Sequence, residues 1–355
     1  ALRIHKSLSK ANLSLSRIKD TKQRYFGRSN LQKMARVDGK YFWVVGGPSL
    51  FSAASRTFIR VSLNKMVPFL PDDHALQVLF LALTRKCPLR CEHCFEGNRL
   101  GPHESLSLDD LKKIVNHFQV RGVAQIQFSG GEPMSRYSDL LQLLGASKTG
   151  TDFWMNTSGF RLDYEKATEL KSAGLTGCIV SLDHFRPTEH NQFRKNPKAF
   201  NWATEAVEAV VKAGMPVTLS LCATKEFISE QNLISYAQMA RDLGATFIQV
   251  LEPKATGFYR GKDVQLDQQQ KALLEDFYWR MTFDPQYHDW PIVSYHEYHK
   301  PALNCGGAGD RFLYVNSVGQ IQACPFCEKP FGSILPCDNH DAIEQMKMVG
   351  CPDLS

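Results

Sequence analysis

From about residue 76 to residue 251, short apolar runs alternate with longer segments in which apolar residues recur every three or four positions. The short runs predict β-strands, and the longer segments predict amphipathic α-helices. The expected strands cover residues 77–83, 123–128, 152–156, 177–182, 216–222 and 246–251. The expected helices cover residues 107–118, 163–173, 200–213 and 232–243. Ser107 and Asp110 have the spacing of a capping box. This alternation is typical of an α/β protein, and six repeats predict a partial (β/α)6 TIM-like barrel with its site at the carboxyl ends of the strands.

The two flanks of this barrel have different patterns. Residues 40–45 and 58–63 predict strands of a small β lead-in, and Pro68 and the Pro-Asp-Asp stretch at 71–73 break the chain after them. A helix at about 265–282 is expected to lead away from the barrel. We therefore expect three parts, which are a basic helical and β lead-in at 1–74, a barrel with its linking helix at 75–300, and a small cysteine-rich extension at 301–355.

The lead-in begins with a strongly basic segment. Residues 1–40 hold eleven Lys or Arg against two Asp, a balance of +9 in a chain whose net charge is +6. Apolar residues at helical spacing, flanked by Lys and Arg, predict a basic amphipathic helix over residues 3–20. This helix could dock on the barrel, or it could contact an acidic peptide, an acidic carrier protein or a membrane surface. We do not expect nucleic-acid binding, because basic and aromatic residues are not interleaved.

Composition is that of an ordinary globular enzyme. The 355 residues are 43% hydrophobic and 22% charged. No apolar run reaches the roughly 18 residues that a membrane span needs, and the first residues lack the apolar core of a signal peptide. We therefore expect a cytoplasmic protein. Eight of the ten cysteines fall in two groups with spacings that suit metal binding better than disulfides, whereas Cys178 and Cys222 lie inside apolar strands and are expected in the core.

The first cysteine group is Cys87, Cys91 and Cys94, with the spacing C-x3-C-x2-C after the first predicted strand. Three thiolates on a short loop can bind three irons of a [4Fe–4S] cluster, which leaves the fourth iron open for a substrate or cofactor. A zinc site or buried cysteines are the simpler interpretations. The motif resembles that of the radical S-adenosylmethionine (SAM) superfamily, in which SAM chelates the open iron. His93 stands where that family usually has an aromatic residue.

Further motifs at predicted strand ends strengthen this resemblance. Ser129-Gly130-Gly131-Glu132-Pro133 follows the second strand, and in the family this segment holds the amino group of SAM. Asn156, Ser181 and Asp183 follow the next two strands and could bind the ribose or the carboxylate of SAM, although capping of the following helices is an alternative for Asn156 and Ser181. The resemblance makes Arg194 the partner of the SAM carboxylate, because a guanidinium can bind a carboxylate with two hydrogen bonds.

The second cysteine group lies in the C-terminal extension. Residues 312–315 and 320–322 predict a β-hairpin that brings the flanking cysteines together. The segment resembles the SPASM or twitch extension, which binds an auxiliary [4Fe–4S] cluster, but it has fewer cysteines than a full SPASM domain. The resemblance therefore implies one auxiliary cluster, with a zinc knuckle as the alternative. The expected ligands are Cys305, Cys324, Cys327 and Cys337, with Cys351 as a substitute.

The resemblance implies a definite reaction. An electron from an external reductant, such as a flavodoxin or ferredoxin, would cleave SAM to methionine and a 5′-deoxyadenosyl radical, which abstracts hydrogen from a peptide or small metabolite. An auxiliary cluster would aid oxidation or bind the substrate. A sulfatase-maturase-like enzyme, a non-catalytic iron–sulfur protein and a zinc-binding protein remain alternatives. Position near the extension makes four residues candidates for substrate contact, namely His296, Tyr298, Arg311 and Tyr314.

Overall fold

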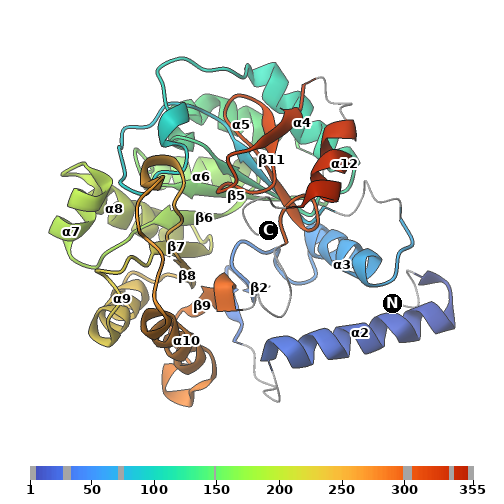
Figure 1. The fold of residues 1–355 in the computed structure, drawn as a ribbon, viewed down its shortest axis with the longest axis horizontal. Coiled ribbons are helices and arrows are strands. Elements are labelled where there is room, and N and C mark those ends of the chain that lie inside the picture. Colours follow the sequence, from blue (N-terminus) through green and yellow to red (C-terminus); the bar gives the residue numbers. More distant parts are fainter. Residues whose placement is uncertain are drawn as a thin grey trace.

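One twisted sheet of ten strands organises the computed structural model (Figure 1). The structure describes residues 5–26, 33–70, 76–147, 149–298, 306–335 and 340–350. The strand order is β12-β11-β10-β3-β4-β5-β6-β7-β8-β9, and every neighbouring pair from β10 to β9 is parallel. The central strands are β3 (Val78–Ala82), β4 (Gln125–Ser129), β5 (Asp152–Thr157), β6 (Leu175–Ser181), β7 (Val217–Cys222) and β8 (Phe247–Leu251). All six match strands expected from the sequence, and the predicted α/β partial barrel is confirmed.

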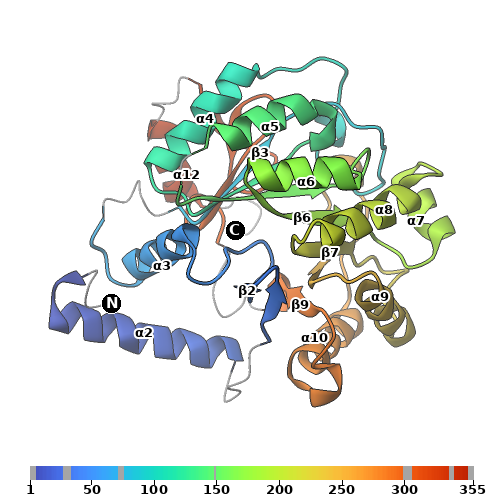
Figure 2. The ribbon, with the colours of Figure 1, turned by 180° about the vertical axis from the view of Figure 1, so that it is seen from behind.

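Helices cover the outer face of this sheet (Figures 1 and 2). The crossover helices are α4 (Leu108–Val120), α5 (Tyr137–Gly145), α6 (Tyr164–Ala173), α7 (Pro187–Arg194), α8 (Ala199–Lys212) and α9 (Glu230–Asp242). The predicted capping box of α4 is present, because the Ser107 side chain accepts from the Asp110 amide and the Asp110 side chain accepts from the Ser107 amide. The sequence prediction missed α5 and α7, which are both short.

The linking helix has a different role from the expected one. Helix α10 (Gln268–Phe283) does not lead away from the barrel, because it returns the chain to β9 (Ile292–Tyr295), which pairs in parallel with β8. Together α10 and β9 add another repeat to the barrel. The strand has only four residues, so its hydrophobic pattern is too short to stand out in the sequence.

Residues 58–63, predicted as a strand, are helical. They lie in α3 (Ala53–Met66), whose N-cap Ser52 accepts a hydrogen bond from the Ser55 amide. The short alternation seen in the sequence is part of a longer helical repeat that buries Ala54, Val61 and Leu63 on one side. The alternation at 58–63 was therefore misleading, whereas Ser52, the N-cap of α3, was the informative signal.

The basic N-terminal helix, α2 (Leu8–Phe26), begins and ends later than expected. It lies beside α3 rather than on the barrel helices, in both views (Figures 1 and 2). Ala11 and Ser14 are buried, and the Arg17 guanidinium donates to the carbonyl of Met66. Leu8 and Leu15, two residues of the predicted apolar face, are 67% and 48% exposed. The docking site of this helix is thus α3, which corrects the expectation of a barrel contact.

The remaining lead-in closes the amino-terminal end of the barrel. Strands β1 (Ala35–Val37) and β2 (Lys40–Phe42) form a small antiparallel hairpin. The Phe42 side chain, 1% exposed, packs with Trp154, Ile179 and Phe247 in a cluster separate from the helix-facing core. These three residues come from β5, β6 and β8, so the cluster forms an apolar floor inside the barrel.

The C-terminal segment continues the barrel sheet. Strands β10 (Phe312–Val315) and β11 (Gln320–Gln322) form the expected hairpin, and β12 (Pro330–Ser333) extends it before α12 (His340–Val349). Strand β10 also pairs in parallel with β3, the strand that leads into the cysteine triplet. The hairpin therefore lies directly beside the start of the barrel.

Candidate functional site

Cys87, Cys91 and Cys94 lie on the loop that follows β3, at the carboxyl edge of the sheet. Their side chains pack together with Leu89, Ala199 and Trp202. Burial raises the pKa of Cys87 and of Cys94 to about 12. A metal must therefore displace the thiol protons when it binds. Within the described ranges no three His, Cys, Asp or Glu side chains surround a single metal ion, but the cysteines of an iron–sulfur cluster each bind a different iron, so convergence on one point is not required.

Backbone contacts hold this loop from two sides. The Glu92 amide donates to the carbonyl of Phe193 in α7, at 3.1 Å. On the other side, the Phe258 amide donates to the carbonyl of Cys94, also at 3.1 Å. Gly257 has a positive φ of 57°, and a Cβ at this position would clash with the carbonyl of Cys94. Glycine is therefore required where the loop after β8 crosses the cysteine loop.

Arg194 connects the cysteine loop to the end of β6. Its Nε donates to the Asp183 carboxylate at 2.6 Å, and its Nη1 lies 3.5 Å from the Cys91 Sγ. The other Asp183 oxygen accepts from the Cys222 amide. Burial alone would raise the pKa of Asp183, but the Arg194 charge, together with His93, His190 and the Cys222 amide, outweighs it and the pKa is lowered. Asp183 and Arg194 are thus a buried ion pair that touches a cluster cysteine.

The Gly-Gly-Glu turn packs on the segment that leads to Cys87. The Gly131 amide donates to the carbonyl of Thr84 at 2.8 Å, and the Glu132 amide donates to the carbonyl of Lys86 at 2.7 Å. A Cβ on Gly130 or Gly131 would meet these same backbone segments. The two glycines therefore allow the turn to approach the protein's own backbone closely, which the sequence interpretation had assigned to a bound ligand.

The Glu132 carboxylate is 1% exposed and fully used by protein donors. One oxygen accepts from the Met134 amide and the Thr157 hydroxyl, and the other accepts from the amide and the hydroxyl of Ser158. Burial raises the pKa of Glu132 in spite of these hydrogen bonds. The carboxylate joins the ends of β4 and β5 at the position where the cofactor is expected.

Asn156 and Ser181 do not cap the helices that follow them. The N-caps of α6 and α7 are Asp163 and Arg186, which removes the alternative considered for both residues. The Asn156 amide donates to the carbonyl of Phe128 at 3.2 Å, and Ser181 is half-buried at the end of β6. Both side chains remain candidates for binding SAM.

His93 is half-buried and packs against Phe193 of α7. Its ring stacks on Phe193 with a centroid distance of 4.6 Å, and its Nδ1 has no hydrogen-bond partner among the residues that the structure describes. Burial lowers its pKa to about 4, so the ring is neutral at pH 7. A neutral, stacked imidazole fills the place of the aromatic side chain usual in the related motif.

The C-terminal cysteines are only partly within the described residues. Cys324 and Cys327 form a turn in which the Cys327 amide donates to the carbonyl of Cys324 at 3.1 Å. Cys327 is buried and Cys324 half-buried. Cys305, Cys337 and Cys351 lie outside the described residues, so the expected auxiliary ligand set stays a prediction.

Two residues that the sequence interpretation overlooked connect the cysteine loop to this segment. Phe95 makes an edge contact with Phe326, between Cys324 and Cys327, at a centroid distance of 5.7 Å. Glu96, 1% exposed, accepts from the Tyr314 hydroxyl at 2.5 Å and from the Ser317 hydroxyl at 3.1 Å. Their position directly after Cys94 was the only signal in the sequence. The cysteine loop and the hairpin therefore pack as one unit.

The four candidates for substrate contact are dispersed. Tyr314 is fully buried and bonded to Glu96, and the Tyr298 hydroxyl accepts from the indole of Trp279. The Arg311 Nε lies 3.6 Å from the Asp310 Oδ2, and His296 is exposed. Tyr314 is thus committed to a structural contact, and the structure does not bring these four residues together in one site.

The loop after β8 is fixed by two side-chain pairs. The Tyr295 hydroxyl donates to Glu252 at 2.7 Å, and Lys254 pairs with Glu297 at 3.0 Å. Glu252 is therefore paired with a hydroxyl group rather than with a cation. Cys178 and Cys222 are buried, as predicted.

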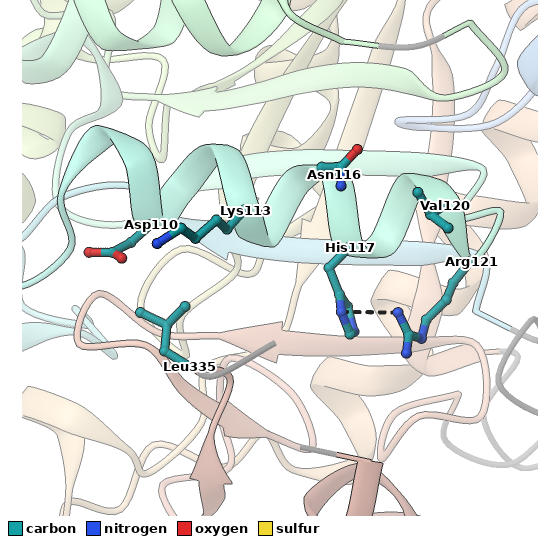
Figure 3. Close-up of a pocket in the computed structure, with 7 residues that line it drawn as sticks. All are labelled: Asp110, Lys113, Asn116, His117, Val120, Arg121 and Leu335. Atoms are coloured by element: carbon teal, nitrogen blue, oxygen red, sulfur yellow. Dashed lines mark hydrogen bonds between the residues drawn. The ribbon is translucent and has the colours of Figure 1, made fainter. Parts of the chain in front are cut away.

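A separate hollow lies outside the barrel, along the exposed side of α4 (Figure 3). It extends from Asp110 to Arg121 and faces Leu335, which follows β12. His117 and Arg121 lie one turn apart on α4, with 3.0 Å between His117 Nδ1 and Arg121 Nη1. Because the core side of α4 carries Leu111, Ile114 and Phe118, this hollow is distinct from the strand ends that carry the cysteines.

Comparisons with known proteins match this arrangement. Residues 81–235 match the family model described as Radical SAM superfamily. An AdoMet-dependent heme synthase of Oleidesulfovibrio alaskensis is 24% identical over 283 residues, which cover 73% of this chain and 72% of that protein. The mycofactocin maturase MftC of Mycobacterium tuberculosis is 28% identical over 253 residues, covering 69% and 63%. The structure of Streptococcus suis SuiB bound to precursor peptide SuiA has a TM-score of 0.61 at 14% identity, covering 95% of this chain and 77% of that one.

The segment that matches the family model contains the cysteine triplet, the Gly-Gly-Glu turn and Arg194. Residues 81–235 are a radical SAM domain, and the protein is an enzyme of the radical SAM class. Its cofactors in this class are a [4Fe–4S] cluster and SAM. No helix in the described ranges is long and apolar enough to cross a membrane.

Proposed function

We infer that this enzyme modifies a peptide, using a SAM-binding cluster on Cys87, Cys91 and Cys94 and a second iron–sulfur centre that includes Cys324 and Cys327. The observation that carries this inference is the joint packing of the cysteine loop and the C-terminal hairpin through Phe95 and Glu96. The relatives named above include a maturase, and a similar fold has been solved with a precursor peptide bound. Both support a peptide as the substrate class.

The residues of the loop fit the first cluster. The three cysteines pack in one group. Backbone hydrogen bonds from the cysteine loop to α7 and to the loop after β8 hold them in place. When bound, the cluster and SAM supply a reductive cleavage that produces a carbon radical able to take hydrogen from a substrate C–H bond. The chain orients the cluster: the Arg194 guanidinium lies on the Cys91 side and shields that sulfur from water.

The SAM seat lies over β4 to β6. We assign its amino end to the turn at Gly130 and Gly131, with Asn156 and Ser181 on the adjoining strands. Glu132 supports this seat indirectly, because its oxygens already accept from residues 134, 157 and 158. Arg194 uses one N–H on Nε and one on Nη2 for Asp183, and one on Nη1 for Cys91. A guanidinium has five N–H groups. Two N–H groups therefore remain for the SAM carboxylate.

The second iron–sulfur centre would accept the second electron that an oxidised substrate must lose. In a two-electron oxidation the substrate loses one hydrogen atom to the adenosyl fragment, and then one electron and one proton. The centre at Cys324 and Cys327, completed by Cys305 and Cys337, would accept that electron, while the proton leaves to solvent. Delivery of the first electron requires an external one-electron donor of the flavodoxin or ferredoxin type.

The test is SAM cleavage by anaerobically reconstituted protein under dithionite, measured as 5′-deoxyadenosine by mass spectrometry. Wild type should form it, and Cys91→Ala should not. Cys178→Ala is the matched control, because Cys178 is buried in β6 away from the loop. Equal loss in both variants would attribute the effect to folding. A full iron load without any 5′-deoxyadenosine would favour an electron carrier, and zinc without iron would favour a binding protein.

A further inference from the structure

Four polar side chains form a row across the inner face of the barrel. The pairing register aligns Ser181 with Ser220 and Ser220 with Gln249, and Gln249 aligns with Ser294. These residues come from β6, β7, β8 and β9 in order. Because directly paired residues of neighbouring strands point to the same face of a sheet, the four side chains lie side by side.

The face on which they lie is the interior of the barrel. Two positions earlier on β6, β8 and β9 stand Ile179, Phe247 and Ile292, which pack on Phe42 in the floor cluster. Side chains alternate between faces along a strand, so residues two positions later share the floor's face. The intervening residues, such as Val180 and Ile248, belong to the helix-facing core instead. The polar row therefore lies one level above the apolar floor, towards the cysteine loop.

The row is open and unused. All four residues are half-buried, whereas their neighbours along the strands are buried. None of their side-chain oxygens or nitrogens has a hydrogen-bond partner in the part of the chain that the structure describes. Polar groups inside a protein are normally paired with protein or water. Four adjacent unpaired groups on a concave face are therefore suited to a ligand.

The neighbouring charged groups already have partners, and no cation among these groups is left to bind an anionic ligand. At the carboxyl ends of β8 and β9, Lys254 pairs with Glu297, and Glu252 accepts from Tyr295. Across the barrel, Arg194 is paired with Asp183. The row itself contains hydroxyl and amide groups only. Its ligand is therefore an uncharged, hydrogen-bonding group rather than a carboxylate or phosphate.

The position of the row separates it from the cofactor. The cysteine triplet follows β3, the glycine turn follows β4, and Asn156 lies in β5, so the expected SAM seat ends at Ser181. The other three members continue away from that seat on β7, β8 and β9. With strands about 4.8 Å apart, four of them span about 14 Å, which corresponds to about four residues of extended peptide.

From this placement we propose that Ser220, Gln249 and Ser294 bind the amide groups of a short uncharged peptide segment and hold it beside SAM. The proposal rests on the peptide-modifying function inferred above. It makes these residues determinants of substrate class, with Ser181 at the boundary between SAM and substrate.

The test uses reconstituted enzyme with SAM and dithionite, and follows 5′-deoxyadenosine against concentration for two probes. One probe is a pool of end-capped octapeptides without charged residues, and the other is xylitol. The peptide pool should stimulate the wild type and xylitol should not. Ser220→Ala and Gln249→Leu should each raise the apparent KM for the pool about fivefold, as expected for one lost hydrogen bond. Ser220→Thr, which keeps the hydroxyl, should restore the lower value.

Matched controls come from the outer helix α9, where Ser235 accepts from Gln231 and Gln238 donates to Asp242. Ser235→Ala and Gln238→Leu should leave the KM for the pool unchanged. Stimulation by xylitol alone would overturn the peptide assignment, and an unchanged KM in both row variants would overturn the binding site. A wild type with full iron load that forms no 5′-deoxyadenosine under any condition would overturn the proposed function itself, and this proposal with it.

Discussion

At the scale of single residues, the surroundings of the cysteine loop are defined by buried charges with specific partners. Asp183 pairs with Arg194, Glu132 accepts from residues 134, 157 and 158, and Glu96 accepts from Tyr314. The sequence made Glu132 and Arg194 visible because they stand in motifs. The sequence could not indicate the partners of these residues, because Arg194 and Cys91, which are in contact, are 103 positions apart in the chain.

The Asp183–Arg194 pair provides a stability test. Arg194→Met should lower the free energy of unfolding by about 3–5 kcal/mol, because it leaves a buried carboxylate without its countercharge. The double variant Arg194→Met/Asp183→Leu should lose less than the single variant. Chemical denaturation measures both. A loss below about 1 kcal/mol for Arg194→Met would show that Asp183 does not depend on this partner.

Asp152 at the start of β5 should make stability depend on pH. One of its oxygens is buried and has no hydrogen-bond partner among the described residues, and burial raises its pKa from 3.8 to about 6. The folded state therefore holds this proton more tightly than the unfolded state, so its contribution is present at low pH and is lost as the pH rises through about 6. The full effect of a shift of about two units is about 3 kcal/mol.

Asp152→Asn should remove this loss and raise the free energy of unfolding at pH 7.5 relative to wild type. Denaturation curves between pH 4 and pH 7.5 measure the difference, because the loss builds up between the two pKa values of 3.8 and about 6. Asp139 on α5, which is bonded to Arg136 and only partly buried, serves as the control carboxylate. If Asp152→Asn has the same pH dependence as wild type, burial of this carboxylate is not its cause.

At the scale of elements, long and well-capped segments were predictable and short ones were not. Helix α4 was identified with its capping box, and all six central strands were found within a few residues. The failures included the four-residue strand β9, the short helices α5 and α7, and the segment 58–63. Each of these segments holds only about two repeats of the hydrophobic pattern, which is too few to distinguish a helical period from a strand period.

Gly257 should control the position of the cysteine loop. Gly257→Ala places a methyl group against the carbonyl of Cys94 at a positive φ, and we expect it to cost about 2–4 kcal/mol and to reduce iron bound on reconstitution. Gly261→Ala is matched in φ, at 74°, but has nothing within 4 Å of the added Cβ. It should cost about 1 kcal/mol and leave iron binding intact. Equal iron contents in the two variants would argue against the contact.

At the scale of the whole molecule, the three expected parts are joined by side-chain packing at one end of the chain and by strand pairing at the other. The lead-in supplies Phe42 to the barrel floor, and β10 of the C-terminal segment pairs with β3. Sequence patterns located the hairpin but not its partner, because strand pairing between residues more than 200 positions apart leaves no local signal. The open polar row inside the barrel was also invisible, since it depends on register across four strands.

Glu96 should be important for holding the hairpin to the cysteine loop. Tyr314→Phe removes one hydrogen-bond donor from the buried Glu96 carboxylate and should lower the free energy of unfolding by about 1–3 kcal/mol. Tyr137→Phe is the control, because its hydroxyl bonds to Glu169 in an exposed pair and should cost below about 0.5 kcal/mol. Thermal and chemical unfolding compare the two. Equal losses would mean that the buried contact between loop and hairpin does not stabilise the enzyme.

The most direct measurement is the electron paramagnetic resonance spectrum of the dithionite-reduced enzyme, recorded with and without SAM. The variant Cys324→Ala/Cys327→Ala should be used beside the wild type, so that only the cluster on Cys87, Cys91 and Cys94 contributes. We predict one [4Fe–4S] signal whose g-values change when SAM is added, because SAM binds the open iron. A signal that is insensitive to SAM, or that persists in Cys91→Ala, would contradict the assignment of this loop as the SAM-binding centre.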